Sequence, residues 1–132
     1  MHRPTTWRAL TVPVDEPVAE CRALGDVEGG AEYRHALVVL GDGSACRTEK
    51  APGYLDPRAA GFDASVTKAL AAADTDALLA LDPVLAGELL AVGRAPWQVL
   101  AAAAAGAPEP LAGEVLYDAA PYGVQYTVAV WR

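Results

Sequence analysis

The feature that most constrains the fold is the apolar stretch HALVVL at residues 35–40, which runs directly into the turn sequence Gly-Asp-Gly-Ser. Successive apolar residues without polar alternation are typical of a strand buried on both faces, as in the centre of a parallel sheet. We therefore expect a central strand over residues 35–40. The stretch RALTVPV at residues 8–14 predicts a second strand, whose Pro13 belongs at a sheet edge or strand end because proline lacks an amide hydrogen.

Cap residues predict helices between and after these strands. Asp15 is a candidate N-cap for a short helix over residues 16–24, which Gly25 is expected to end. Asp-Pro pairs at residues 56–57 and 82–83 each predict a helix start, because aspartate caps the first turn and proline fits the first helical position.

Apolar spacing supports the first of the Asp-Pro helices, since Phe62, Val66 and Leu70 fall on one helical face. A last helix is expected over residues 95–105, and alternating residues near the C-terminus predict two strands. The expected fold is one α/β domain over residues 1–132. Its sheet is mixed and largely parallel, is flanked by helices, and ends in a two-stranded C-terminal segment.

Charge and composition restrict the partners of the chain. The net charge of −7 opposes binding to nucleic acids or anionic membranes, which both select basic patches. No apolar run approaches the ~20 residues of a membrane span, and the first ten residues lack the apolar core of a signal peptide. We therefore expect a cytoplasmic protein without nucleic-acid or membrane partners. Cys21 and Cys46 lack a CxxC spacing and are expected to be free thiols.

The loop after residue 40 does not match two common catalytic loops. Its glycines do not have the spacing of a Walker A motif, and Pro52 prevents a helix from starting at Lys50. Ser44 lacks the Gly-x-Ser-x-Gly context of a nucleophile. The only two histidines are His2 at the terminus and His35, which the predicted strand places far from Ser44.

Two interpretations of this loop remain. In the first, it lines a crevice for a small-molecule ligand, because strand ends in α/β folds form such crevices. In the second, its aspartate and serine only hydrogen-bond to the turn, and its charged residues are a solvated surface. The candidate ligand-binding residues are Asp42, Ser44, Arg47, Glu49 and Lys50, with no metal among the expected groups.

Several stretches together carry a resemblance to a known family. These are TVPVDEPVAECRALG, the segment from GDGSACRTEK to GRAPWQVLAAAA, and GEVLYDAAPYGVQYTVAVW. They resemble the class III extradiol ring-cleavage dioxygenase superfamily, the domain of the ring-cleaving beta subunit, and are closest to an actinobacterial branch. The resemblance covers nearly all of this chain but only about the C-terminal half of a family domain. Family members cleave aromatic rings with Fe(II), which two histidines and one glutamate hold, and another histidine acts as acid and base.

Most of the iron-binding pattern has no counterpart here. The two ligand histidines belong to the half of the domain that the resemblance does not cover, and His2 in MHRP matches a His-x-Pro motif only superficially. The acid/base histidine corresponds to Ala45 or Cys46, and the ligand glutamate to Ala95 or Pro96. One helix earlier lies Glu88, which is not assumed to replace that ligand.

The resemblance therefore implies a partial dioxygenase-like fold that is not catalytically competent alone and acts by binding or assembly, with no cofactor. A half-domain exposes a sheet edge, and such edges tend to be paired, so we expect a homo-oligomer. The alternative is an Fe(II)-dependent extradiol dioxygenase completed by a missing N-terminal part or by a partner chain. A third alternative is an unrelated activity of the loop thiol or carboxylates.

Overall fold

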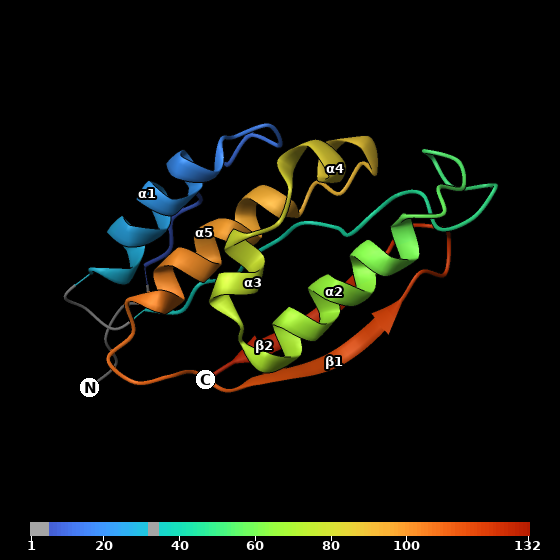
Figure 1. The fold of residues 1–132 in the computed structure, drawn as a ribbon. Coiled ribbons are helices and arrows are strands. Elements are labelled where there is room, and N and C mark those ends of the chain that lie inside the picture. Colours follow the sequence, from blue (N-terminus) through green and yellow to red (C-terminus); the bar gives the residue numbers. More distant parts are fainter. Residues whose placement is uncertain (1–5, 32–34) are drawn as a thin grey trace.

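The computed structural model describes residues 6–31 and 35–132 of the chain. Within these ranges the helices lie on one side of a two-stranded antiparallel sheet, and α2 runs along that sheet, closest to β1 (Figure 1). The elements are α1 (Val18–Gly29), α2 (Ala59–Ala72), α3 (Thr75–Leu79), α4 (Pro83–Glu88), α5 (Arg94–Ala105), β1 (Gly113–Ala119) and β2 (Tyr126–Trp131).

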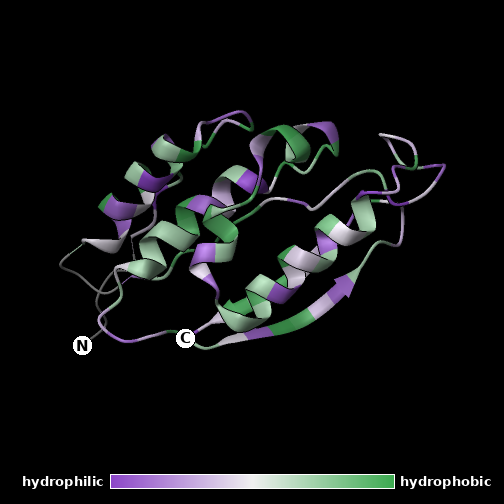
Figure 2. Ribbon diagram, in the orientation of Figure 1, coloured by the Kyte–Doolittle hydropathy of each residue, from purple (hydrophilic) through white to green (hydrophobic). Residues whose placement is uncertain are grey.

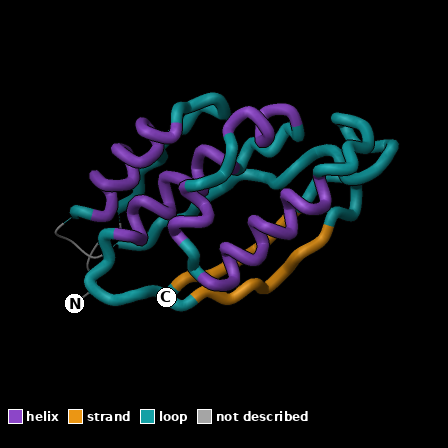
Figure 3. The backbone as a smooth tube through the Cα atoms, in the orientation of Figure 1, coloured by secondary structure: helices purple, strands orange, loops and turns teal. Residues whose placement is uncertain are grey.

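The expected mixed, largely parallel sheet is wrong. Residues 8–14 and 35–40 form no strand, and Figure 3 shows the described chain between α1 and α2 as loop. The apolar run is also not buried, because Val38 and Leu40 have exposed fractions of 86% and 81%. A central strand needs a hydrogen-bonded neighbour on each edge. Among the described residues, no other segment supplies one to residues 36–40.

The two-stranded C-terminal segment is present, and its strands pair in antiparallel register. Gly113 lies opposite Trp131, and the register shifts between Val115 and Tyr117. The helix-facing side of the sheet carries Val115, Ala129 and Trp131, which pack against the main core. The opposite side is more open, and Val128 there is half exposed.

Helix α2 covers the inner side of this sheet with the apolar face that its sequence predicts. Phe62, Val66 and Leu70 are all buried in the main core, which confirms that part of the prediction. The indole nitrogen of Trp131 donates a hydrogen bond of 2.7 Å to the carbonyl oxygen of Leu70. Helix and sheet are therefore held together by both apolar packing and a directed bond.

The contact between α1 and α5 explains why the prediction for Gly25 is wrong. The helix does not end there but continues to Gly29. A Cβ atom on Gly25 would lie 2.3 Å from the carbonyl oxygen of Val99, and one on Gly29 would lie 2.5 Å from that of Ala103. These glycines therefore allow close backbone approach between the two helices, which lie side by side in Figure 1.

The cap predictions have mixed outcomes. Asp82 caps α4 as expected, accepting a hydrogen bond of 2.9 Å from the amide of Val84. Asp56 does not cap α2, because its carboxylate accepts the amide of Arg58 before the helix begins. The last helix matches the expectation, since α5 extends over residues 94–105. None of the helices in the described residues is long and apolar enough to cross a membrane.

Candidate functional site

The loop of residues 41–47, here called the junction loop, connects two distant parts of the chain. The amide of Gly43 donates to the carbonyl oxygen of Gln125 at 2.9 Å, just before β2. The amide of Gly93 donates to the carbonyl oxygen of Asp42 at 2.8 Å, just before α5. The Gly-Asp-Gly-Ser turn therefore fixes the sheet and α5 relative to each other.

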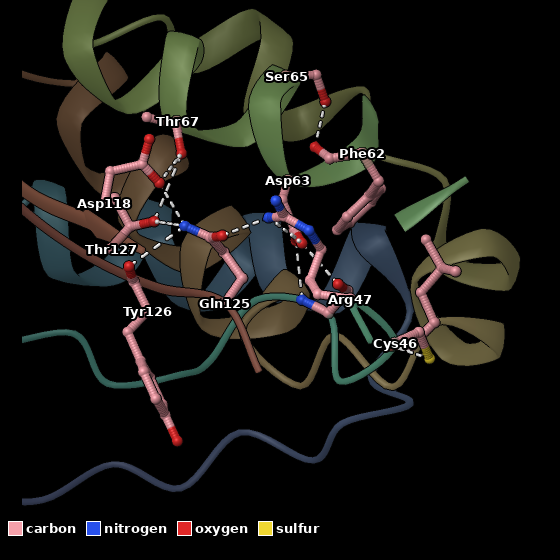
Figure 4. Close-up of polar contacts among 12 residues, drawn as sticks. Cys46, Arg47, Phe62, Asp63, Ser65, Thr67, Asp118, Gln125, Tyr126 and Thr127 are labelled. Atoms are coloured by element: carbon pink, nitrogen blue, oxygen red, sulfur yellow. Dashed lines mark hydrogen bonds and ion pairs between the residues drawn. The ribbon is translucent and has the colours of Figure 1, made fainter. Parts of the chain in front are cut away.

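Asp63 holds the junction loop from the side of α2. One of its carboxylate oxygens accepts the amide of Ser44 at 2.8 Å, and the other accepts the Ser44 hydroxyl at 2.6 Å. Nη1 of Arg47 lies 3.5 Å from the second oxygen, and Figure 4 shows the two side chains facing each other. Asp63 is only 2% exposed. The free-energy cost of burying its charge is offset by the hydrogen bonds that these donors make to it.

A chain of polar contacts continues from Arg47 toward the sheet (Figure 4). Nη1 of Arg47 donates to Oε1 of Gln125 at 2.6 Å. The side-chain nitrogen Nε2 of Gln125 donates in turn to the carboxylate of Asp118 and to the hydroxyl of Thr127. The hydroxyl of Thr67, on α2, also donates to Asp118 at 3.3 Å. The network thus joins the junction loop, α2 and both strands, and its buried groups are paired as a stable interior requires.

The predicted ligand-binding residues do not form one site, because some are buried and others are exposed. Ser44 is fully buried, and its hydroxyl is engaged by Asp63, so it has no surface to offer a ligand. The side chain of Asp42 is exposed, and only its carbonyl oxygen takes part in the junction. Glu49 and Lys50 line an open surface depression of about 550 Å³ beside the turn at residues 121–123.

A smaller depression of about 160 Å³ lies over the polar network. The polar side chains that line it are Arg47, Asp63, Asp118 and Gln125. One guanidinium meets two carboxylates here, which makes the local charge unfavourable for an anion. Because Nη1 of Arg47 is bound to Gln125, the arrangement serves mainly to hold the fold, and ligand binding at the loop stays a prediction.

The two cysteines are free and buried, which confirms their prediction as free thiols. The thiol of Cys46 donates to the carbonyl oxygen of Leu89 at 3.4 Å. Burial raises the pKa of the Cys21 and Cys46 thiols above their ordinary value. Both groups are therefore protonated at neutral pH, and a protonated thiol is a weak nucleophile.

A metal site needs several ligand side chains that converge on one point. In the described residues, no group of three or more histidine, cysteine or acidic side chains could hold a metal ion. Glu88 forms an ion pair of 2.8 Å with Arg58. Arg58 also donates hydrogen bonds to Asp56, and these bonds lower the pKa of the Asp56 carboxyl. His2 lies outside the described residues, and the Fe(II)-dependent alternative stays a prediction.

Sequence reasoning missed the buried polar residues that shape this region. Asp63 stands directly after Phe62 on the buried face of α2, and a carboxylate inside an apolar stripe was the available signal. Arg94 is also buried, and its guanidinium donates to the carbonyl oxygens of Glu16 at 2.6 Å and Val14 at 3.0 Å. It thereby fastens the exposed segment before α1 to the start of α5.

Together the fold and the junction define a helical protein with a small antiparallel sheet, in which a buried polar network holds a loop in place. No family model matches the chain, and no curated protein matches it. The resemblance to the extradiol dioxygenase superfamily therefore stays a prediction from the sequence.

Proposed function

We propose that this protein is a non-catalytic subunit that works by binding further copies of itself in the cytoplasm. The observation that carries the proposal is the segment of residues 36–40, called the open segment below. It is apolar and exposed, and no backbone hydrogen bond joins it to another described residue. Exposed apolar strand-like segments with open backbone groups are templates for pairing with another chain.

Further exposed apolar side chains lie outside the open segment. Trp7 is 87% exposed, and Leu10 lies half exposed in the extended stretch before α1. On the sheet, Leu116 and Val128 are also exposed. Figure 2 shows green, hydrophobic stretches along the chain outside the helices. A partner that covered these side chains would remove their apolar area from water, which supports a role in assembly.

The total surface area supports a second copy as the partner. The chain exposes 8631 Å². A compact monomer of 13.7 kDa is expected to expose about 6,600 Å². The excess of roughly 2,000 Å² lies within the range that an obligate homodimer buries on each subunit, which is about 1,000–2,500 Å².

Light scattering after size-exclusion chromatography tests this proposal. At micromolar concentrations we expect a mass of twice 13.7 kDa, or a higher multiple, with dissociation on dilution. The mass should not fall when salt is raised, because burial of apolar surface is not screened by ions. A single species of 13.7 kDa up to about 100 μM would rule out self-assembly, since a dimer of useful affinity forms below that concentration.

A further inference from the structure

We propose that the open segment pairs with the same segment of a second copy, antiparallel and centred on Val38. This inference rests on the proposed self-assembly and adds its surface, its register and its symmetry. Pairing of identical segments about a two-fold axis uses the same surface on both copies and gives a closed dimer. Pairing with a different element would leave one of the two surfaces free on each outer copy, where further copies could add.

The side chains of the open segment already have the alternation of a strand. Val39 is half-buried and packs against the main core, while its neighbours Val38 and Leu40 are more than four-fifths exposed. In an extended chain, successive side chains point to opposite sides. The segment therefore has one row of side chains against its own core and the other row exposed. Its backbone N–H and C=O groups, which bond to no other described residue, are the groups that a partner strand would pair.

The end of the segment is fixed before any partner arrives. A Cβ atom on Gly41 would lie 2.5 Å from the Cα atom of Gly93, so the backbone passes closely against the start of α5. The next residue, Asp42, accepts the amide of Gly93, and Gly43 bonds to the residue before β2. Because one end is held in this way, less conformational entropy is lost when a second strand pairs with it.

Charge does not oppose contact between two such segments. Residues 36–41, ALVVLG, have no ionisable side chain, although the whole chain has a net charge of −7. An edge strand that avoids pairing usually carries a lysine or another charged residue. In the proposed register, Val38 faces Val38 of the partner subunit and Leu40 faces Ala36 of the partner subunit. These cross-strand apolar pairs add to the backbone hydrogen bonds.

The test compares two valines that are both exposed and lie on different surfaces. Val38 is in the open segment, and Val84, which is 68% exposed, is on α4. Val38→Lys and Val84→Lys change the net charge equally, so charge alone cannot separate them. We expect V38K to weaken the dimer by at least about tenfold in light scattering and V84K to leave it unchanged. Circular dichroism checks that both variants are folded.

Cysteine cross-linking tests the register itself. In Val38→Cys the two new thiols would face each other across the two-fold axis, at a Cα separation that a disulfide spans. We expect V38C, but not Val84→Cys, to form a dimer that a reductant separates. Wild-type protein gives the background, because Cys21 and Cys46 are buried.

The outcomes separate the two proposals. A monomeric wild type overturns the proposed function and this inference together. A wild-type dimer that V38K does not weaken overturns the inference and leaves self-assembly standing, with another surface as the interface. A dimer that V38K weakens but V38C does not cross-link overturns the register centred on Val38, and with it the inference as stated.

Discussion

Replacing Asp63 with alanine is expected to lower the free energy of unfolding by about 3 kcal/mol, measured by urea denaturation. The buried carboxylate accepts both the amide and the hydroxyl of Ser44 and lies beside Arg47. Its removal leaves the donors of Ser44 buried without partners and removes the link between α2 and the junction loop. The cost of such unpaired groups exceeds the small gain in helix propensity from alanine.

The matched control for this change is Asp26→Ala, because Asp26 is an exposed aspartate on α1. We expect its effect on the free energy of unfolding to stay within about 0.5 kcal/mol. Equal small effects of both substitutions would show that the junction loop does not depend on the Asp63 carboxylate. A shift in the urea midpoint of D63A alone, at an unchanged slope, would agree with the structure.

Replacing Gly25 with alanine is expected to lower the free energy of unfolding by about 2 kcal/mol, as overpacking of a tight contact does. The new Cβ atom would lie 2.3 Å from the carbonyl oxygen of Val99. That oxygen belongs to the backbone of α5 and cannot rotate away, so α1 and α5 would have to separate. The loss outweighs the gain of about 0.5–1 kcal/mol that alanine gives over glycine inside a helix.

The same substitution in α2 should act in the opposite direction. A Cβ atom on Gly61 would meet no atom within 4 Å, so Gly61→Ala is expected to raise the free energy of unfolding by about 0.5 kcal/mol. Thermal unfolding of G25A, G61A and the wild type measures both changes in one experiment, and we expect a lower melting temperature for G25A and a higher one for G61A. If G25A also stabilised the protein, the close approach of α1 and α5 would be contradicted.

The sequence predicted the helices well where local signals and burial agree. Phe62, Val66 and Leu70 form the buried face of α2, and Asp82 caps α4, because helix periodicity and capping depend on residues within one or two turns. Gly25 shows the limit of such signals. Glycine usually ends a helix, but here the need for close contact with α5 decides its position inside one.

The two strands expected at residues 8–14 and 35–40 failed for a different reason, whereas the two C-terminal strands are present. An apolar run shows that a segment needs to be covered, but it does not show that the same chain covers it. The described residues provide no ladder partner for residues 36–40, and the run is exposed as a result. The candidate site had a similar limit, because Asp63 and Gln125 come from distant parts of the sequence. Only the folded backbone brings them to Ser44 and Arg47.

Hydrogen–deuterium exchange of the open segment tests the central claim most directly. The amides of residues 36–40 have no hydrogen-bond partner among the described residues of one chain. In an antiparallel pair every second amide of a strand bonds to the partner. If copies pair through this segment, exchange of that alternate set of amides should slow by about tenfold or more as the protein concentration rises through the assembly range. The amides of α2 should not change. Rapid exchange of the open segment at every concentration would contradict pairing between copies at this segment.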